Sequence, residues 1–149
     1  MQLASSKILD RDYFLSISTT MNLDSRCLLL VAMDDLYYYA MGSYDYSITN
    51  SAIEVRKYVE RNLDITTDQL MYVINRYGGE LFLVDKERAI QSLANSLHNN
   101  KHRAFCREVL EFFLAHIQAL MDDNVHNNAV ISDLWNNYVI RILKNKLFG

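Results

Sequence analysis

Two acidic, asparagine-rich phrases contain the residues of this chain that are best suited to chemistry. One runs from Asp45 to Ile53 and the other from Asp122 to Val130, with Asp, Asn and Ala at matching positions. Each phrase follows a long apolar segment and precedes another. Because carboxylate and amide oxygens are the ligands that hard cations prefer, two such loops brought together would offer a cation site. The same groups would otherwise form a polar docking patch for a protein.

The candidate binding residues lie in these phrases or directly before them. The candidates for binding a partner are Asp45, Asn50, Asp122, Asp123, Asn127, Tyr38 and Tyr44. If a metal is bound, its ligands are expected among Asp45, Asp122, Asp123 and His126. A structural alternative is that each aspartate only caps the following helix, while the Ser and Asn residues form the turn.

The histidines and cysteines favour structural roles. His98 and His102 have the spacing of two metal ligands on one helix, but the two asparagines between them favour a helix break and a solvated loop. His116 falls on an apolar stripe, which predicts a partly buried, hydrogen-bonded ring. Cys27 and Cys106 make no disulfide framework, and packing in the core is their expected role.

A run of tyrosines precedes the first phrase. Tyr37, Tyr38 and Tyr39 are consecutive, and Tyr44 and Tyr46 follow closely. Successive residues of a helix point about 100° apart, so at least one of the three is expected to be exposed. Tyrosine is favoured at interfaces, which makes the cluster a candidate partner surface. The alternative is that two rings are core and the third is incidental.

Composition limits the function classes. The net charge is −3, which gives no electrostatic case for nucleic acid. The longest apolar run, Leu28 to Met33, is far shorter than the roughly 20 residues that span a bilayer. Near the C-terminus, basic and apolar residues alternate from Arg141 to Phe148. A weak helix at a membrane surface is one interpretation of this segment, and a solvated helix end is the preferred one.

The elements that must position these residues are helices. The chain has no proline and four glycines, and apolar residues recur at helical spacing. We expect a single all-α domain over residues 1–149, a compact bundle of about seven helices. The expected helices lie at about 13–17, 23–41, 52–63, 66–77, 85–97, 109–120 and 131–143. Asn22 or Asp24 can cap the second of these, Thr66 with Gln69 forms a capping-box pattern at the start of the fourth, and Gly78-Gly79 is expected to end it. The helix at 23–41 is apolar nearly all round, which predicts a central, buried position.

The two phrases resemble those of the TerB-like (tellurite-resistance B) family, in which Asp-Gly-x-hydrophobic-x-x-x-Glu begins a helix. Asp45 and Asp122 stand at the Asp position, with Ile48 and Val125 at the hydrophobic one. The resemblance implies an all-helical fold with an internal pseudo-duplication, whose halves here are about 23–63 and 102–143.

The departures from the family pattern bear on the site. Tyr46 and Asp123 replace the glycines, and Ala52 and Ala129 replace both glutamates. The acidic surface of the family is therefore reduced, and we expect divalent cations to bind weakly or not at all.

The sequence therefore predicts a cytoplasmic, non-enzymatic interaction or stress-response module, without a cofactor, that binds a protein partner. Two cysteines and the lack of an apolar signal core are typical of a cytoplasmic protein. An alternative is a helical adaptor of viral or mobile-element origin, which would bind a partner helix in an apolar groove as Bcl-2-like folds do. The oligomeric state and the identity of the partner stay open.

Overall fold

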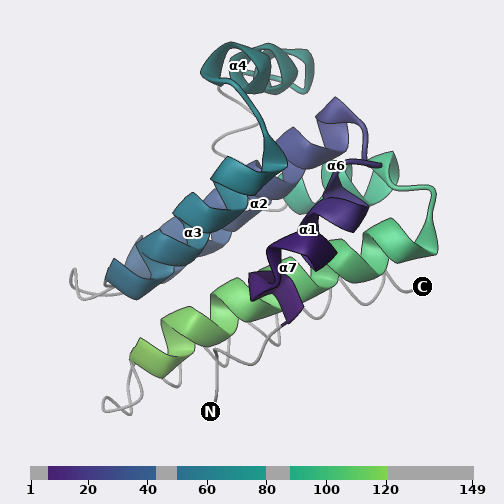
Figure 1. The fold of residues 1–149 in the computed structure, drawn as a ribbon. Coiled ribbons are helices and arrows are strands. Elements are labelled where there is room, and N and C mark those ends of the chain that lie inside the picture. The colour runs from purple at the N-terminus through teal and green to yellow at the C-terminus, as the bar shows by residue number, and fades with distance from the viewer. Residues whose placement is uncertain (1–6, 43–49, 80–87, 121–149) are drawn as a thin grey trace.

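Every regular element in the described part of the chain is helical. The computed structural model describes residues 7–42, 50–79 and 88–120, and no β-strand occurs within them. The elements are the 3₁₀ turn η2 (Lys7–Leu9) and the helices α1 (Arg11–Ser18), α2 (Leu23–Gly42), α3 (Asn50–Leu63), α4 (Thr67–Arg76), α6 (Arg88–Ser96) and α7 (Asn100–Leu120). The all-α fold expected from the sequence is confirmed (Figure 1).

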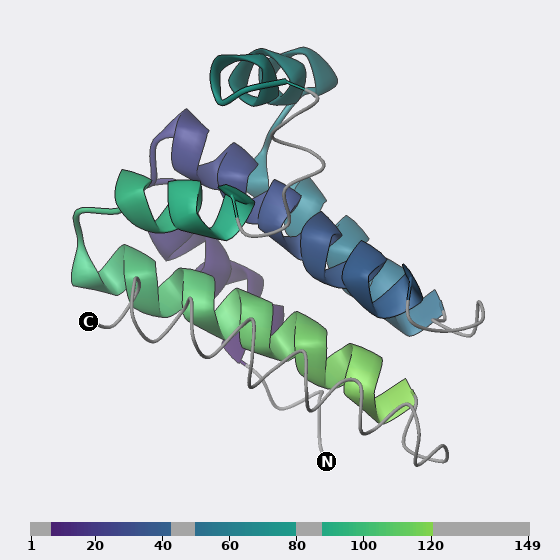
Figure 2. The same ribbon diagram turned by 180° about the vertical axis from the view of Figure 1, so that it is seen from behind.

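Helix α2 lies at the centre of the fold, as the sequence predicts. It contacts α3, α4, α6 and α7, which surround it (Figures 1 and 2). From Cys27 to Met33 no side chain is more than 3% exposed. Because burying one leucine side chain stabilises a fold by about 1.5–3 kcal/mol, removing this stretch from water is a large part of the driving force for folding.

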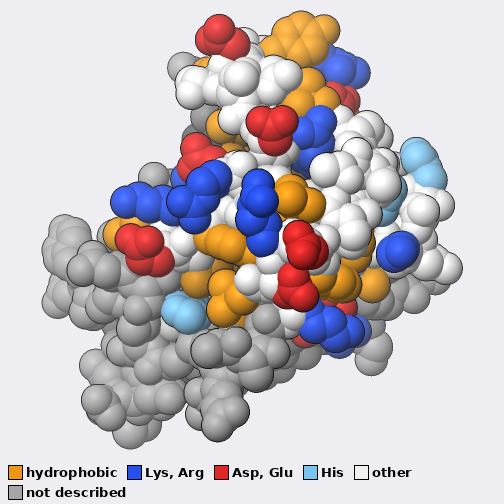
Figure 3. Space-filling view, in the orientation of Figure 1, with side chains coloured by type: hydrophobic (Ala, Val, Ile, Leu, Met, Phe, Trp, Pro, Cys, Tyr) orange, Lys and Arg blue, Asp and Glu red, His pale blue; other side chains and the backbone are white. Residues whose placement is uncertain are grey.

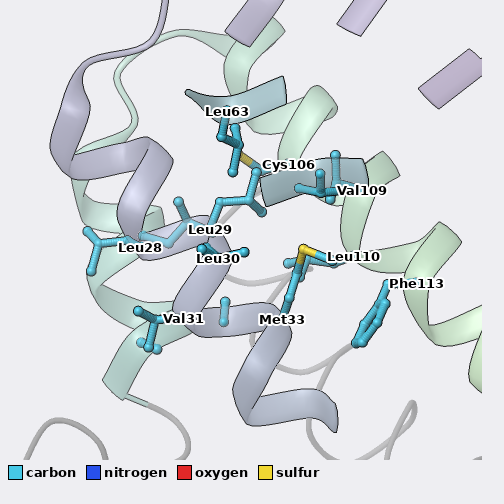
Figure 4. Close-up of a cluster of buried hydrophobic side chains, with 14 of the residues drawn as sticks. Leu28, Leu29, Leu30, Val31, Met33, Leu63, Cys106, Val109, Leu110 and Phe113 are labelled. Carbon is cyan, nitrogen blue, oxygen red and sulfur yellow. The ribbon is translucent and has the colours of Figure 1, made fainter. Parts of the chain in front are cut away.

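The core extends from α2 to the ends of two neighbouring helices. Figure 4 shows Leu63 of α3 and Cys106 of α7 beside the α2 leucines, and Met33 beside Leu110 of α7. Phe113 closes the same cluster from α7 (Figure 4). All of these side chains are at most 1% exposed. The last turn of α3 is therefore held firmly against the core.

Helix α1 is short, and its position depends on one aromatic side chain. The Phe14 ring packs edge-on against Tyr58 of α3, with centroids 5.7 Å apart, and against Phe105 of α7 at 5.0 Å. Such pairs are worth about 0.5–1.5 kcal/mol beyond the area they bury. The Tyr58 hydroxyl also donates to the carbonyl of Ile8, 2.7 Å away. These contacts place α1 across α3 and α7 (Figure 1).

The helix starts follow the capping residues of the sequence. The Asn22 side chain accepts from the backbone N–H of Ser25 at 2.7 Å, so Asn22 serves as the cap of α2. The predicted capping box of α4 is present: Gln69 N–H donates to the Thr66 hydroxyl at 3.1 Å, and Thr66 N–H donates to the Gln69 side chain at 3.0 Å.

The predicted end of α4 is also confirmed. Gly78 and Gly79 both have positive φ, 126° and 59°. Gly79 N–H donates to the Ile74 carbonyl at 2.9 Å, and Gly78 N–H donates to Asn75 at 3.4 Å, which is the Schellman arrangement. Glycine is required here because a side chain is strained in this left-handed backbone.

Two fold predictions lie partly outside the described residues. Six α-helices occur within the described ranges, and the seventh, expected at 131–143, lies beyond them. The proposed duplication compares 23–63 with 102–143, and the second loop and helix of that comparison are not described. The duplication therefore stays a prediction.

Replacing the α4 cap tests the energetic role of the capping box. We expect Thr66→Ala to destabilise α4 by about 1 kcal/mol, because the backbone N–H of Gln69 loses its acceptor, the Thr66 hydroxyl. Thr67→Ala removes a neighbouring exposed hydroxyl outside the box and should change stability little. Amide hydrogen exchange of α4 measures both effects. Equal protection in the two variants would contradict the assigned cap.

Candidate functional site

The predicted partner surface lies almost wholly outside the described residues. Asp45, Tyr44, Asp122, Asp123, Asn127 and His126 are in segments that the structure does not describe. Asn50 is the first residue of α3 and Tyr38 lies in α2, but their side chains are not described. The predicted meeting of the two acidic loops therefore stays a prediction.

His98 and His102 do not lie on one helix. His98 is exposed between α6 and α7, and His102 lies in α7, with its Nε2 2.8 Å from the Thr20 hydroxyl. The predicted helix break between the two histidines is thus confirmed. The predicted solvated loop holds for His98 but is wrong for His102, because α7 already begins at Asn100.

For His116, the predicted partial burial is confirmed, and the predicted hydrogen bond is not found among the described residues. The ring is half-buried beside Phe112, with centroids 5.5 Å apart, but Nδ1 has no hydrogen-bond partner among the described residues. Burial lowers the pKa of His116.

The cysteines are core side chains, as predicted. Cys27 and Cys106 are free and fully buried. Burial raises the pKa of the Cys27 thiol to about 11 and raises that of Cys106 further. Since the thiolate is the reactive form, both thiols are expected to be inert in the folded protein.

A thiol-reagent assay checks this assignment. With a pKa near 11, roughly one Cys27 thiol in a thousand is thiolate at pH 8, so labelling of the native chain should be slow. Both thiols should react at once in concentrated urea. Rapid labelling of either cysteine without denaturant would show that the core opens around it.

A pocket of ligand size lies among the described residues, where three helices meet. It has a volume of about 490 Å³. Its walls come from α1, from the first turns of α2 and from the end of α3. The lining residues are Arg11, Leu15, Ser18, Thr19, Arg26, Arg61, Asn62, Leu63 and Asp64. We call this feature the arginine pocket, because three arginines from three separate helices line it.

Asn62 holds the first of these arginines. It is 5% exposed, and its Oδ1 accepts from Arg11 Nε at 3.0 Å. Its Nδ2 donates to the carbonyl of Tyr58 at 2.8 Å, which fixes the amide orientation. Because Phe14 and Tyr58 already lock α1 onto α3, this bond presents Arg11 to the pocket from a rigid support.

Arg26 approaches from α2 and caps the end of α3. Its Nη1 donates to the carbonyls of Leu63 at 2.7 Å and Asp64 at 3.3 Å. A cation at this position offsets the partial negative charge of a helix C-terminus. Its Nε is buried and has no hydrogen-bond partner among the described residues. The Arg26 side chain therefore keeps donor capacity that the fold does not use.

Arg61 is the least constrained of the three. It is exposed and makes no hydrogen bond or ion pair with any residue in the described ranges. Arg61 and Arg11 both act on the hydroxyl of Tyr58: burial is the largest effect and raises the Tyr58 pKa, while these two positive charges oppose the increase. Both guanidinium groups are therefore close enough to the Tyr58 hydroxyl to change its pKa.

Unlike three other arginines of the fold, the pocket arginines have no carboxylate partner within the described residues. Arg56 binds Asp34 through two nitrogens, Arg76 binds Asp24 at 3.2 Å, and Arg107 binds Glu111. Arg103, which donates to the carbonyl of Leu97 at 2.9 Å, resembles the pocket arginines in this respect. None of the three pocket arginines is ion-paired within the described residues. Figure 3 shows basic side chains gathered over the middle of this face, above α3 and beside α1. The pocket is thus positive in a chain whose net charge is −3.

Asp64 is the one acidic residue that lines the pocket, and its backbone is unusual. Its φ is 56°, a left-handed conformation that favours glycine. It directly follows α3, at the position where a glycine often ends a helix. Strained residues of this kind gather at functional sites more often than elsewhere.

A second hollow adjoins the arginine pocket. It has a volume of about 350 Å³ and is lined by Lys57, Glu60, Arg61, Asp64 and Ile65. Arg61 and Asp64 belong to both walls. The two hollows therefore share a wall at the end of α3.

Comparison of the chain with protein-family models, with curated proteins and with solved structures finds no match. The geometry of the site is therefore the basis for inferring its function. Among the described helices, none combines the length and the apolar character needed to cross a bilayer. The described residues also bring no three His, Cys, Asp or Glu side chains together in a way that would hold a metal ion.

No pattern in the sequence indicates the arginine pocket. Its three arginines are spread over fifty positions, in three helices, and no spacing links them. Two features of the sequence are consistent with such a site. Arg26 and Arg61 stand near predicted helix ends, and Asn62 is a polar residue directly before the last apolar residue of its helix. Recognising the site would have required knowing which helix ends meet.

The strain at Asp64 can be measured. Asp64→Gly should raise the free energy of unfolding by roughly 0.5–1 kcal/mol, because relief of the left-handed strain outweighs the added freedom of the unfolded chain. Asp64→Ala keeps a Cβ atom and removes only the carboxylate, so it should not stabilise. Urea unfolding compares the two variants. An equal gain in both would assign the effect to charge instead of to backbone strain.

Proposed function

We propose that this chain is a non-enzymatic helical binding module that holds an anionic group of its ligand in the arginine pocket. The observation that carries the proposal is the convergence of Arg11, Arg26 and Arg61 on one hollow without ion-pair partners in the described residues. Guanidinium groups stay charged at all physiological pH values and donate in a fork that suits carboxylates and phosphates.

The energetics of the pocket support a ligand. Like charges brought together raise the free energy of a fold, and an anion that enters removes this repulsion. The buried hydroxyl of Ser18 and the buried Nε of Arg26 both lack hydrogen-bond partners among the described residues. Buried polar groups are nearly always paired, so two unpaired donors in one pocket wall favour an absent acceptor.

The sequence-based proposal of a cytoplasmic, TerB-like interaction or stress-response module is compatible with this function. Its support is the pair of acidic phrases and the two thiols kept buried in the core, Cys27 and Cys106. The arginine pocket adds a second kind of surface to that proposal. The acidic loops would contact a protein partner, while the pocket would take an anion.

A test of the function measures the thermal midpoint with small multivalent anions at constant ionic strength. Inorganic phosphate, succinate and citrate are suitable probes. We expect at least one of them, at about ten times its Kd, to stabilise the wild-type chain by about 1.4 kcal/mol, equivalent to roughly 3–6 °C. Arg61→Gln should abolish this shift, because it removes one of the three positive charges of the pocket. The variant should still fold, because Arg61 makes no hydrogen bond or ion pair within the described residues.

Two matched variants control the test. Asp64→Asn tolerates the left-handed backbone and removes the one carboxylate of the pocket lining, so it should strengthen anion binding. Arg107→Gln removes one positive charge from the exposed side of α7 and should leave the shift unchanged. If no anion stabilises the wild type more than the Arg61→Gln variant, the pocket has no such function.

A further inference from the structure

The ligand class can be narrowed from the chemistry of the pocket wall. We propose that the arginine pocket binds a phosphate monoester of a small organic molecule. This inference rests on the proposed function, since it concerns the same pocket. Three properties of the wall carry it: its net charge, the arrangement of its donors, and its apolar part.

The charge of the wall matches a dianion. Three arginines and Asp64 leave an excess of two positive charges. A phosphate monoester carries about −1.5 to −2 charges near neutral pH, which nearly balances this excess. One carboxylate would leave about one positive charge uncompensated.

The donors reach the pocket from different elements instead of from one side. Arg11 begins α1, Arg26 lies in the first turns of α2, and Arg61 lies in the last turn of α3. A tetrahedral phosphate presents three acceptor oxygens in different directions, whereas both oxygens of a carboxylate lie in one plane. Donors carried by three separate helices therefore suit the tetrahedral group better.

Ser18 provides an observation that is independent of the arginines. It lines the pocket from α1, is 1% exposed, and its Oγ has no hydrogen-bond partner among the described residues. A serine in a helix usually finds a carbonyl of the preceding turn. The hydroxyl is buried in the unliganded chain, so it would donate to a ligand oxygen after a local rearrangement of the wall.

The rest of the pocket indicates an organic ester. Leu15 and Leu63 also line it, and its volume of about 490 Å³ lies within the range of about 300–1,000 Å³ that is usual for small-molecule sites. A bare phosphate ion would leave these apolar walls uncovered. The adjoining hollow, which shares Arg61 and Asp64 and contains Ile65, gives the organic group further room.

The experiment compares four probes by calorimetric titration of the full chain. Phenyl phosphate represents the proposed class, and inorganic phosphate lacks the organic group. Phenylsuccinate carries the same ring with two carboxylates, and a phosphoserine peptide represents a protein source of the same phosphate chemistry. We expect phenyl phosphate to bind about tenfold more tightly than each of the other three.

Variants connect this affinity to the pocket. Arg61→Gln should weaken phenyl phosphate binding by about tenfold or more, and Arg107→Gln by less than about twofold. Ser18→Ala should weaken binding severalfold while leaving the thermal midpoint of the free protein unchanged or higher, because the hydroxyl is unpaired in the described fold. Circular dichroism verifies that each variant is folded.

The outcomes separate the two proposals. If phenylsuccinate binds as tightly as phenyl phosphate, with the same dependence on Arg61, the anion-binding function stands and the phosphate inference is wrong. If the phosphopeptide binds more tightly, the ligand is a protein and the small-molecule inference is wrong. If no probe binds the folded wild-type chain, both proposals are overturned.

Discussion

Helix α2 has no side facing water between Cys27 and Met33, and most of the described structure is arranged to cover it. Four of the other five described α-helices contact it. An amphipathic helix needs one partner face, but a helix that is apolar all round must be enclosed. The short helices α4 and α6 and the long helices α3 and α7 together form this enclosure (Figure 2).

The arginine pocket lies where the start of α2 meets the end of α3, at one end of this enclosure. The last turn of α3 is fixed by the burial of Leu63, and Arg26 of α2 binds the carbonyls that this turn leaves free. The polar groups that join the helix ends are therefore the groups that line the pocket. Their local arrangement is not the most stable one possible, because two unpaired buried donors and a left-handed Asp64 each destabilise the fold by about 1 kcal/mol or more.

Much of the fold could be predicted because its signals are local. The cap at Asn22, the capping box at Thr66 and the stop at Gly78 depend on hydrogen bonds within a few residues, and all three occur where the sequence predicts them. The buried stripe of α6 follows in the same way from helical spacing. The turn η2 was missed, since three residues are too few to show a period.

The candidate site could not be predicted, because it depends on contacts between distant residues. Arg11 and Asn62 are 51 positions apart and Arg26 and Leu63 are 37 apart, and no pattern of either segment indicates the other. The sequence directed attention to acidic loops instead, because repetition is visible in a sequence and convergence in space is not. A buried asparagine near a helix end, such as Asn62, is the kind of residue whose partner only a structure identifies.

The central position of α2 also has a consequence for the order of events during synthesis. The ribosome completes α2 at residue 42 and α3 at residue 63, but α6 and α7 are complete only at residues 96 and 120. At about 5–20 residues per second, the nascent pair α2–α3 waits several seconds for its remaining partners. Through that interval the segment from Leu28 to Met33 exposes the kind of apolar surface that chaperones bind. The helix that organises the finished fold is thus the segment that most needs protection while the fold is incomplete.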